Sequence, residues 1–308
     1  MEKISEKEKK RDLKEEDKKE EVSKQEEVRT KRRRSKSKKR REKKHVRTEK
    51  CTIPPTLEEI DERIKGSYLE TMNFASFKPL TEIEGRIQCP KCKSNRKFYC
   101  YACYVPLARD VPQLKLPVNF TVLKHPGEKM GKSSIIASKI IAPDNVTIHN
   151  SLEISEFDYD STILLFPKED SVPITSMPKE TLESVKNVVL IDSTWLQVNK
   201  FLQNENVSKL KTVVINTEKT IFWRYQRGVT DKNLSTIEAM YFFMRDYDKV
   251  MSEKDYDGKY DNLLYFYAYT YALIQNEYKK GLKKDKEFKT IKGYVKEKSE
   301  EDNKEGSG

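Results

Sequence analysis

Short apolar runs, rich in β-branched residues, recur between residues 111 and 290, and each run stops abruptly at polar side chains or proline. Uninterrupted runs of this length are typical of strands that are buried on both faces of a parallel sheet. The pattern predicts four such strands, at residues 118–123, 161–167, 187–191 and 212–216. Apolar residues with helical spacing lie between or after them, at residues 132–141, 179–186, 195–204, 235–251 and 260–280. This alternation predicts an α/β domain with a mainly parallel sheet flanked by helices.

The third predicted strand runs directly into Asp192-Ser193-Thr194-Trp195. Ligands of open α/β sheets bind outside the carboxyl ends of the strands, so an acid at this position is expected to face a bound molecule. The same four residues also fit a turn that caps the next helix. The stretch alone therefore leaves a catalytic role and a capping role for Asp192 equally open.

A second polar cluster, His125-Pro126-Gly127-Glu128, follows the first predicted strand. Because the carboxyl ends of parallel strands meet at one edge of a sheet, we expect this cluster at the same edge as Asp192. A turn residue that precedes a proline is the competing explanation for His125.

A third polar stretch, Ser235-x-x-Glu238, has the spacing of a capping box and begins the helix predicted at residues 235–251. The free N–H groups and the positive dipole end of such a helix are able to hold a carboxylate. Arg224 and Arg227 lie just upstream and favour an anion site, although a capping box usually only caps. Tyrosines in the last predicted helix fit either the covering of the sheet or the stacking of bases, and we favour the first.

Four of the five cysteines form two C-x-x-C pairs, Cys89/Cys92 and Cys100/Cys103, separated by seven residues. Two such pairs place four thiolates within reach of one tetrahedral ion, and four thiolates suit Zn²⁺. The pattern predicts a small zinc ribbon whose four protein ligands leave no position open for catalysis. Four reduced core cysteines are the alternative. Basic residues around the pairs would also allow the ribbon to face RNA, and Cys51 stands apart as a spare thiol.

The charge of the chain is concentrated at one end. Residues 1–50 contain 23 Lys and Arg and 13 Asp and Glu, so they carry +10 of the chain's net charge of +11. A segment with so few apolar residues is expected to be disordered. Its Lys31–Lys44 run holds 11 basic residues in 14, a density that fits a nuclear localisation signal read by importin, or a sequence-independent contact with RNA. A solvated tail is the third interpretation.

The sequence argues against membrane and secreted classes. No apolar run is long enough to span a bilayer, and the N-terminus has no apolar signal segment. Clustered cysteines also favour a reducing compartment. We expect four parts: a disordered basic tail at residues 1–50, a segment with the zinc module at 51–110, the α/β domain at 111–282, and a charged C-terminal tail at 283–308.

Four stretches occur in an order that resembles a known family. Asp192-Ser193-Thr194-Trp195 is similar to the D-x-T-W signature of the DTW-domain tRNA-uridine aminocarboxypropyltransferases, with Ser193 where bacterial members often have glycine. Three further matches are His125-Pro126-x-Glu128 to H-P-x-E, residues 164–167 to L-L-x-P, and residues 234–239 to L-S-T-x-E-A. The resemblance covers roughly residues 86–280. Residues 99–106 and 222–226 look most like the animal member assigned to D-loop position 20.

The resemblance implies a SPOUT-like fold with a C-terminal knot that holds S-adenosylmethionine. Members transfer the 3-amino-3-carboxypropyl group of this co-substrate to N3 of a uridine in tRNA, which gives acp3U and methylthioadenosine. The expected partner is therefore tRNA. The Lys31–Lys44 run makes the nucleus the expected location, with the cytoplasm as a second site.

The resemblance also implies roles for individual residues. Asp192 is the proposed general base for uridine N3–H, and holding the amino group of S-adenosylmethionine is the alternative. Thr194 and Trp195, in the same signature loop, are the other catalytic candidates. Trp195 is expected to pack beneath the loop and fix Asp192, and a direct contact with uracil is the alternative. The expected cofactor contacts are Leu165, Phe166, Pro167, Arg224, Leu234, Ser235, Thr236 and Glu238, with His125 and Glu128 as further candidates.

Two other functions compete with this one. A SPOUT-like RNA methyltransferase would release adenosylhomocysteine instead of methylthioadenosine. A non-catalytic zinc-ribbon adaptor that binds RNA would bind no S-adenosylmethionine and would leave tRNA unmodified.

Overall fold

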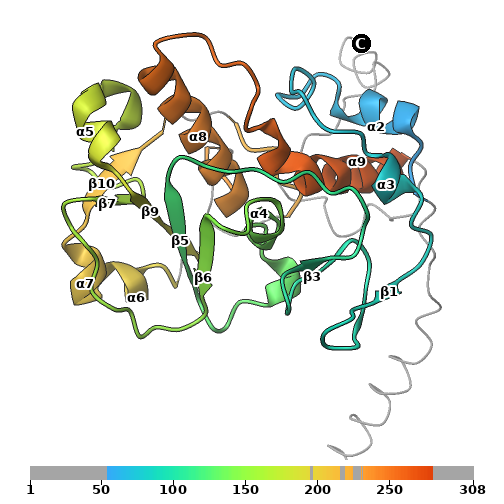
Figure 1. Ribbon diagram of the computed structural model, residues 1–308, viewed down its shortest axis with the longest axis horizontal. Coiled ribbons are helices and arrows are strands. Elements are labelled where there is room, and N and C mark those ends of the chain that lie inside the picture. Colours follow the sequence, from blue (N-terminus) through green and yellow to red (C-terminus); the bar gives the residue numbers. More distant parts are fainter. Residues whose placement is uncertain (1–53, 195–196, 216–218, 225–229, 231, 280–308) are drawn as a thin grey trace, which may run out of the picture. The chain divides into compact units, whose positions relative to one another are not determined.

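Six parallel strands form the central sheet of the protein, in the order β6-β5-β9-β7-β10-β8. The computed structural model describes residues 54–194, 197–215, 219–224, 230 and 232–279 (Figure 1). The strands are β5 (Asn119–Lys124), β6 (Val146–His149), β7 (Thr162–Leu165), β8 (Val172–Pro173), β9 (Asn187–Asp192) and β10 (Lys211–Val214). Four of them match the strands predicted from apolar runs, and the parallel sheet confirms the predicted fold class.

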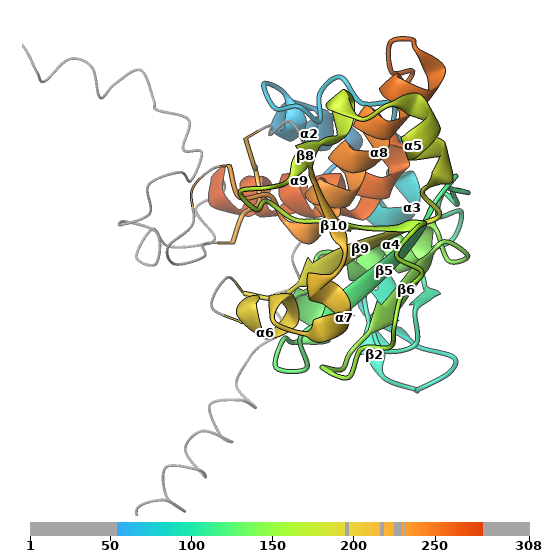
Figure 2. The same cartoon turned by 90° about the vertical axis from the view of Figure 1, so that its left-hand side faces the viewer.

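Helices cover both faces of this sheet, because successive strand residues point to opposite sides. In β9, Val188 and Leu190 belong to the larger core, whereas Val189 belongs to a smaller core with Phe201 and Val207. The larger core includes residues of α4 (Ile136–Ile141), α5 (Lys179–Ser184), η2 (Ile174–Ser176), α8 (Thr236–Ser252) and α9 (Tyr265–Lys279). The smaller core includes residues of α6 (Asn199–Leu202) and α7 (Glu205–Ser208), which Figure 2 shows on the other side of the strands from α8.

Several helices begin later than their apolar spacing predicts, including the one predicted at residues 195–204, which is observed as α6 (Asn199–Leu202). The helix predicted from residue 132 begins at Ile136, after the 3-10 turn η1 (Met130–Lys132), because Ser133 and Ser134 make hydrogen bonds to other elements. The last helix is likewise preceded by η3 (Asp261–Leu264). Among the described helices, none has both the length and the apolar composition that a bilayer-spanning segment needs.

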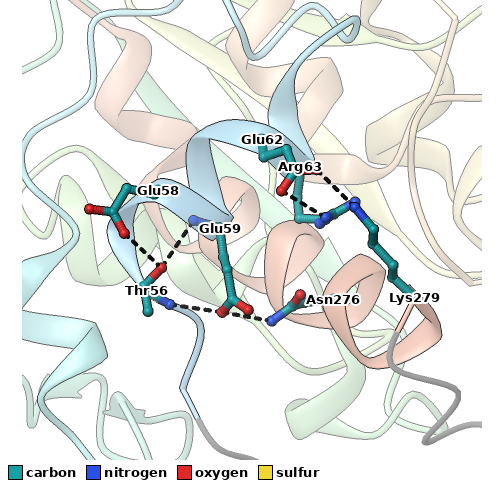
Figure 3. A network of polar contacts seen from close by, with 7 residues as sticks. All are labelled: Thr56, Glu58, Glu59, Glu62, Arg63, Asn276 and Lys279. Carbon is teal, nitrogen blue, oxygen red and sulfur yellow. Dashed lines mark hydrogen bonds and ion pairs between the residues drawn. The ribbon is translucent and has the colours of Figure 1, made fainter.

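The segment ahead of the cysteines contains α2 (Leu57–Ile64) and α3 (Lys78–Thr81). Thr56 and Glu59 form a capping box at the start of α2. Two hydrogen bonds then join α2 to α9: Asn276 Nδ2 donates to Glu59 at 3.0 Å and Lys279 Nζ donates to Glu62 at 2.8 Å (Figure 3). The helix α2 packs along α9 and was not among the helices predicted from apolar spacing.

The cysteine module consists of two short antiparallel ladders, as the spacing of the cysteines suggests. One pairs β1 (Ile87–Gln88) with β2 (Asn95–Arg96), and the other pairs β3 (Tyr99–Cys100) with β4 (Val105–Pro106). The module packs on α9 through two edge-to-face aromatic pairs, Phe98 with Tyr269 at 5.1 Å and Tyr99 with Phe266 at 4.8 Å between ring centroids.

Candidate active site

A cavity of about 410 Å³ opens at the carboxyl ends of β7, β9 and β10, beside the N-terminus of α8. This is the edge of the sheet at which ligand-binding loops are expected. The volume lies in the range of small-molecule sites, ~300–1,000 Å³. Most of the predicted site residues line it: Glu128, Leu165, Phe166, Pro167, Asp192, Thr194, Arg224, Leu234, Ser235 and Thr236.

Asp192 ends β9 and is only 8% exposed. Its Oδ1 accepts a hydrogen bond from Thr236 Oγ1 at 2.8 Å, and its Oδ2 accepts one from Ser133 Oγ at 2.7 Å. The turn that follows is held instead by the carbonyl of Thr194, which accepts from Val198 N at 3.1 Å. The carboxylate of Asp192 therefore joins three elements at the cavity and does not cap the next helix.

The pKa of Asp192 lies above its usual value, because burial penalises the charged carboxylate. The hydrogen bonds from Ser133 and Thr236 and the charge of Lys124 act in the opposite direction without cancelling the effect of burial. Glu128 raises the pKa further. A carboxylate with increased proton affinity in a cavity has the character of a general base.

Lys124 is completely buried and lies opposite Asp192 in the register of β5 and β9. Its Nζ donates to the carbonyl oxygens of His125, at 3.1 Å, and Glu128, and to Asn150 Oδ1 at 3.2 Å. Burial lowers the pKa of Lys124, and the charges of Asp192 and Glu128 oppose this shift. Lys124 thus closes the loop that carries Glu128, a role that the sequence analysis missed although a lysine at the end of an apolar run was its signal.

His125 lies outside the cavity lining and is 7% exposed. Its Nδ1 accepts from Gly127 N at 3.0 Å, and its ring meets Phe201 edge-to-face at 6.0 Å between centroids. Its backbone N donates to the carbonyl of Asp192 at 3.0 Å. These contacts match the turn interpretation of His125, which supports the end of β9 from behind.

Glu238 is also absent from the cavity lining, and it is completely buried in the first turn of α8. Its oxygens accept five hydrogen bonds of 2.7–3.2 Å, from the side chains of Tyr68, Thr220 and Tyr267 and from the backbone N–H groups of Ser235 and Ile221. The predicted capping box is therefore present. The same carboxylate ties α9 and residues 220–221 to the helix start that borders the cavity.

Among the described residues, three basic side chains line the cavity, those of Lys132, Arg224 and Lys232. Arg224 Nη1 donates to the carbonyl of Lys132. Arg224 also interacts electrostatically with Tyr99 of the cysteine module. Burial raises the pKa of Tyr99 to about 12, while the Arg224 guanidinium acts to lower it. Together with the acids Glu128 and Asp192 and the positive end of α8, these cations suit a ligand that carries both an ammonium and a carboxylate.

The four cysteine sulfurs of the predicted metal site lie within 4.8 Å of one another. Cys92 Sγ and Cys100 Sγ are 3.6 Å apart, close to the roughly 3.8 Å that tetrahedral Zn–S bonds of ~2.3 Å give. Both knuckles turn in the same way, because Lys93 and Tyr104, which follow their second cysteines, have φ values of 58° and 54°. The donor set and its geometry therefore fit a structural Zn²⁺.

Some residues of the cavity were not predicted from the sequence, and one predicted residue lies outside the described part of the chain. The cavity is also lined by Lys132, Ser133, Ser134 and Lys232. These residues belong to none of the four motifs, so no sequence pattern marked them as site residues. Trp195, predicted to pack beneath the signature loop, lies outside the described residues.

The chain is similar to known proteins. A model described as the DTW domain matches residues 97–275, more than half of the chain. The chain belongs to the DTW-domain family. A Xenopus tropicalis relative named tRNA-uridine aminocarboxypropyltransferase 1 is 31% identical over 284 residues, covering 75% of this chain and 97% of the relative. The Homo sapiens protein of the same name is 35% identical over 255 residues, covering 68% of this chain and 84% of the relative.

The matched DTW domain contains every described cavity residue and the second cysteine knuckle, but begins after the first knuckle. A solved structure, the SAM-dependent rRNA:acp-transferase Tsr3 from Vulcanisaeta distributa, is 16% identical, with a TM-score of 0.27 and coverage of 55% of this chain and 91% of that one. This likeness is too distant to define the fold of the DTW domain. The knot implied by the family resemblance stays a prediction, because part of the chain between β10 and α8 lies outside the described residues.

Proposed function

We propose that this DTW-domain protein transfers the 3-amino-3-carboxypropyl group of S-adenosylmethionine to N3 of a uridine in tRNA. The names of its relatives support the proposal. The matched DTW domain contains the described cavity residues. The observation that carries the proposal is the meeting of a buried acid of raised pKa, Asp192, with a cationic wall and apolar loops in one cavity at the carboxyl edge of the sheet.

The cavity offers a matching group for each part of S-adenosylmethionine. The apolar surfaces of Leu165, Phe166 and Leu234 suit adenine and its ribose. Arg224, with the positive dipole end of α8, suits the carboxylate. Glu128, half-buried in the lining, suits the ammonium. Anchoring both charged ends bends the aminocarboxypropyl chain, so that its γ-carbon rather than the methyl group faces the acceptor.

The reaction then needs one proton acceptor. Asp192 accepts the N3 proton as N3 forms a bond to the γ-carbon of the co-substrate. The bond between the γ-carbon and sulfur breaks, and its electron pair stays on sulfur, so that neutral methylthioadenosine leaves. Because the sulfonium is already a good leaving group, most of the acceleration comes from positioning the two reactants.

The test uses the purified full chain, S-adenosylmethionine and a tRNA transcript that lacks modifications. We expect acp3U in the nucleoside digest by mass spectrometry, together with an equal amount of methylthioadenosine. Methylated uridine with adenosylhomocysteine would show a methyltransferase instead. Failure to bind S-adenosylmethionine, with unchanged tRNA, would support the adaptor and overturn the proposal.

We infer further that the Lys31–Lys44 run, which lies outside the described residues, directs the protein to the nucleus through importin. Removing residues 1–50 should move a fluorescent fusion to the cytoplasm and leave the Michaelis constant for tRNA unchanged at every salt concentration. A higher Michaelis constant with a weaker salt dependence would show that the tail captures RNA.

A further inference from the structure

The second cysteine knuckle contacts η1, the turn whose last residue lines the cavity. Tyr101, between Cys100 and Cys103, places its ring so close to Gly131 that a Cβ on this glycine would lie 3.1 and 3.2 Å from ring carbons. Such a distance is shorter than ordinary contact, so the lack of a side chain at Gly131 is what lets ring and backbone meet. On the module side, the Arg96 guanidinium lies 4.2 Å from the centroid of the same ring. Tyr101 therefore links the module to η1.

The C-terminal end of η1 forms part of the cavity. The carbonyl of Lys132, the last residue of η1, accepts a hydrogen bond from Arg224. The next residue, Ser133, donates to Asp192 Oδ2 at 2.7 Å. All four residues line the cavity. A displacement of this three-residue turn would therefore move both a cationic group and the hydroxyl that holds the proposed base.

The second knuckle has fewer contacts with the α/β domain than the residues just before it. Phe98 and Tyr99 pack on α9, and the carbonyl of Phe98 accepts from the backbone N–H groups of Leu107 and Ala108. These contacts lie outside the loop between Cys100 and Cys103. An ion held by all four cysteines would cross-link this loop to Cys89 and Cys92, and its binding energy would fix the loop geometry.

We propose that the four-cysteine module is part of the co-substrate site, because its metal holds Tyr101 against Gly131 and so positions Lys132 and Ser133. The identity of the ligand rests on the proposed function, whereas the coupling between metal and turn does not. Tyr101 is a positioning residue that acts through η1. Loss of the metal, or oxidation of its thiolates, then weakens ligand binding while the α/β sheet stays folded.

Truncation of the ring is the first test. Tyr101→Ala should keep one zinc per chain and the wild-type circular dichroism spectrum, yet weaken S-adenosylmethionine binding in calorimetry about tenfold, or ~1.4 kcal/mol. Tyr101→Phe keeps the ring and should bind like the wild type. Tyr159→Ala, a tyrosine packed on the smaller core, is the matched control and should also bind like the wild type. Wild-type affinity in Tyr101→Ala would overturn the proposal.

The contact itself is tested by a double-mutant cycle. Gly131→Ala places a Cβ against the ring and should weaken binding by a similar factor. In the Tyr101→Ala background that Cβ has room, so adding Gly131→Ala should cost nothing more. Additive losses in the double variant would contradict a direct contact between the two residues.

Metal removal supplies a readout that does not depend on the reaction. In the chelated full chain, hydrogen exchange of a peptide spanning residues 129–135 should become faster, while peptides from β9 keep their protection. Unchanged exchange at residues 129–135 would overturn the coupling even if acp3U forms normally. Faster exchange in a protein that forms no acp3U would refute only the proposed function. A higher Michaelis constant for tRNA in Tyr101→Ala, with unchanged exchange and co-substrate affinity, would show that the ring contacts RNA instead.

Discussion

Substitution of Asp192 by asparagine separates the stability of the site from its chemistry. The raised pKa of Asp192 means that the charge costs the folded protein more by burial than the Ser133, Thr236 and Lys124 interactions return. Asparagine has nearly the shape of the uncharged acid, and it forfeits about one hydrogen bond, ~1 kcal/mol. We therefore expect the free energy of unfolding of Asp192→Asn at pH 7 to lie within ~1 kcal/mol of the wild type.

The rate should respond very differently. A general base contributes about 10²–10⁴-fold, which corresponds to roughly 3–5 kcal/mol in the activation free energy. Single-turnover release of methylthioadenosine from saturated enzyme measures this loss directly. Calorimetry of S-adenosylmethionine binding on the same variant separates the two roles considered for Asp192, because a base should leave the affinity unchanged and an anchor for the ammonium should not.

The pH dependence of stability gives an independent check that the pKa of Asp192 is raised in the folded protein. A carboxyl whose folded pKa is raised contributes stability that is complete below its unfolded pKa, ~3.9, and that is lost as pH rises through the folded value. Asparagine does not titrate. In urea denaturation, the free energy of unfolding of Asp192→Asn should therefore increase relative to that of the wild type as pH rises through this window. A free energy of unfolding that falls relative to the wild type as pH rises would refute the burial argument. A turnover rate within ~3-fold of the wild type would refute the assignment of Asp192 as the general base.

Three further predictions concern the groups around the cavity. Glu238→Gln leaves some of its five donors facing an amide N–H₂, so urea denaturation should show a loss of ~2–4 kcal/mol, whereas Glu253→Gln, in an exposed ion pair, should cost under ~1 kcal/mol. Arg224→Ala should weaken S-adenosylmethionine binding about tenfold in calorimetry with an unchanged melting temperature, while exposed Arg109→Ala changes neither. Lys124→Met should cost ~2–4 kcal/mol and lower turnover, because three acceptors lose their donor.

Each of these expectations has an outcome that contradicts it. Equal stability losses in Glu238→Gln and Glu253→Gln would mean that the buried carboxylate does not organise the start of α8. Wild-type affinity in Arg224→Ala would remove this residue from the co-substrate site. Full activity in Lys124→Met would show that the loop of His125 and Glu128 keeps its position without the lysine.

The sequence by itself determined the sheet and the loops at its edge. Apolar runs such as residues 187–191 predict buried strands because hydrophobic burial is read directly from composition. Strands that lie at the sheet's two ends were missed: β6 and β8 each have exposed residues and lack such a run. The capping box at Ser235 and the grouping of the four cysteines were predicted because their contacts span few residues along the chain.

The tertiary structure alone decided which polar residues meet. Asp192, Ser133 and Thr236 are far apart in the chain, and no periodicity relates them, so only the packing of α8 on β9 brings their oxygens within 2.8 Å. Packing likewise placed Glu238 behind the cavity, where five donors surround it. The contact of Tyr101 with Gly131 joins two segments that lie about 30 residues apart in the chain, and local sequence patterns do not encode it.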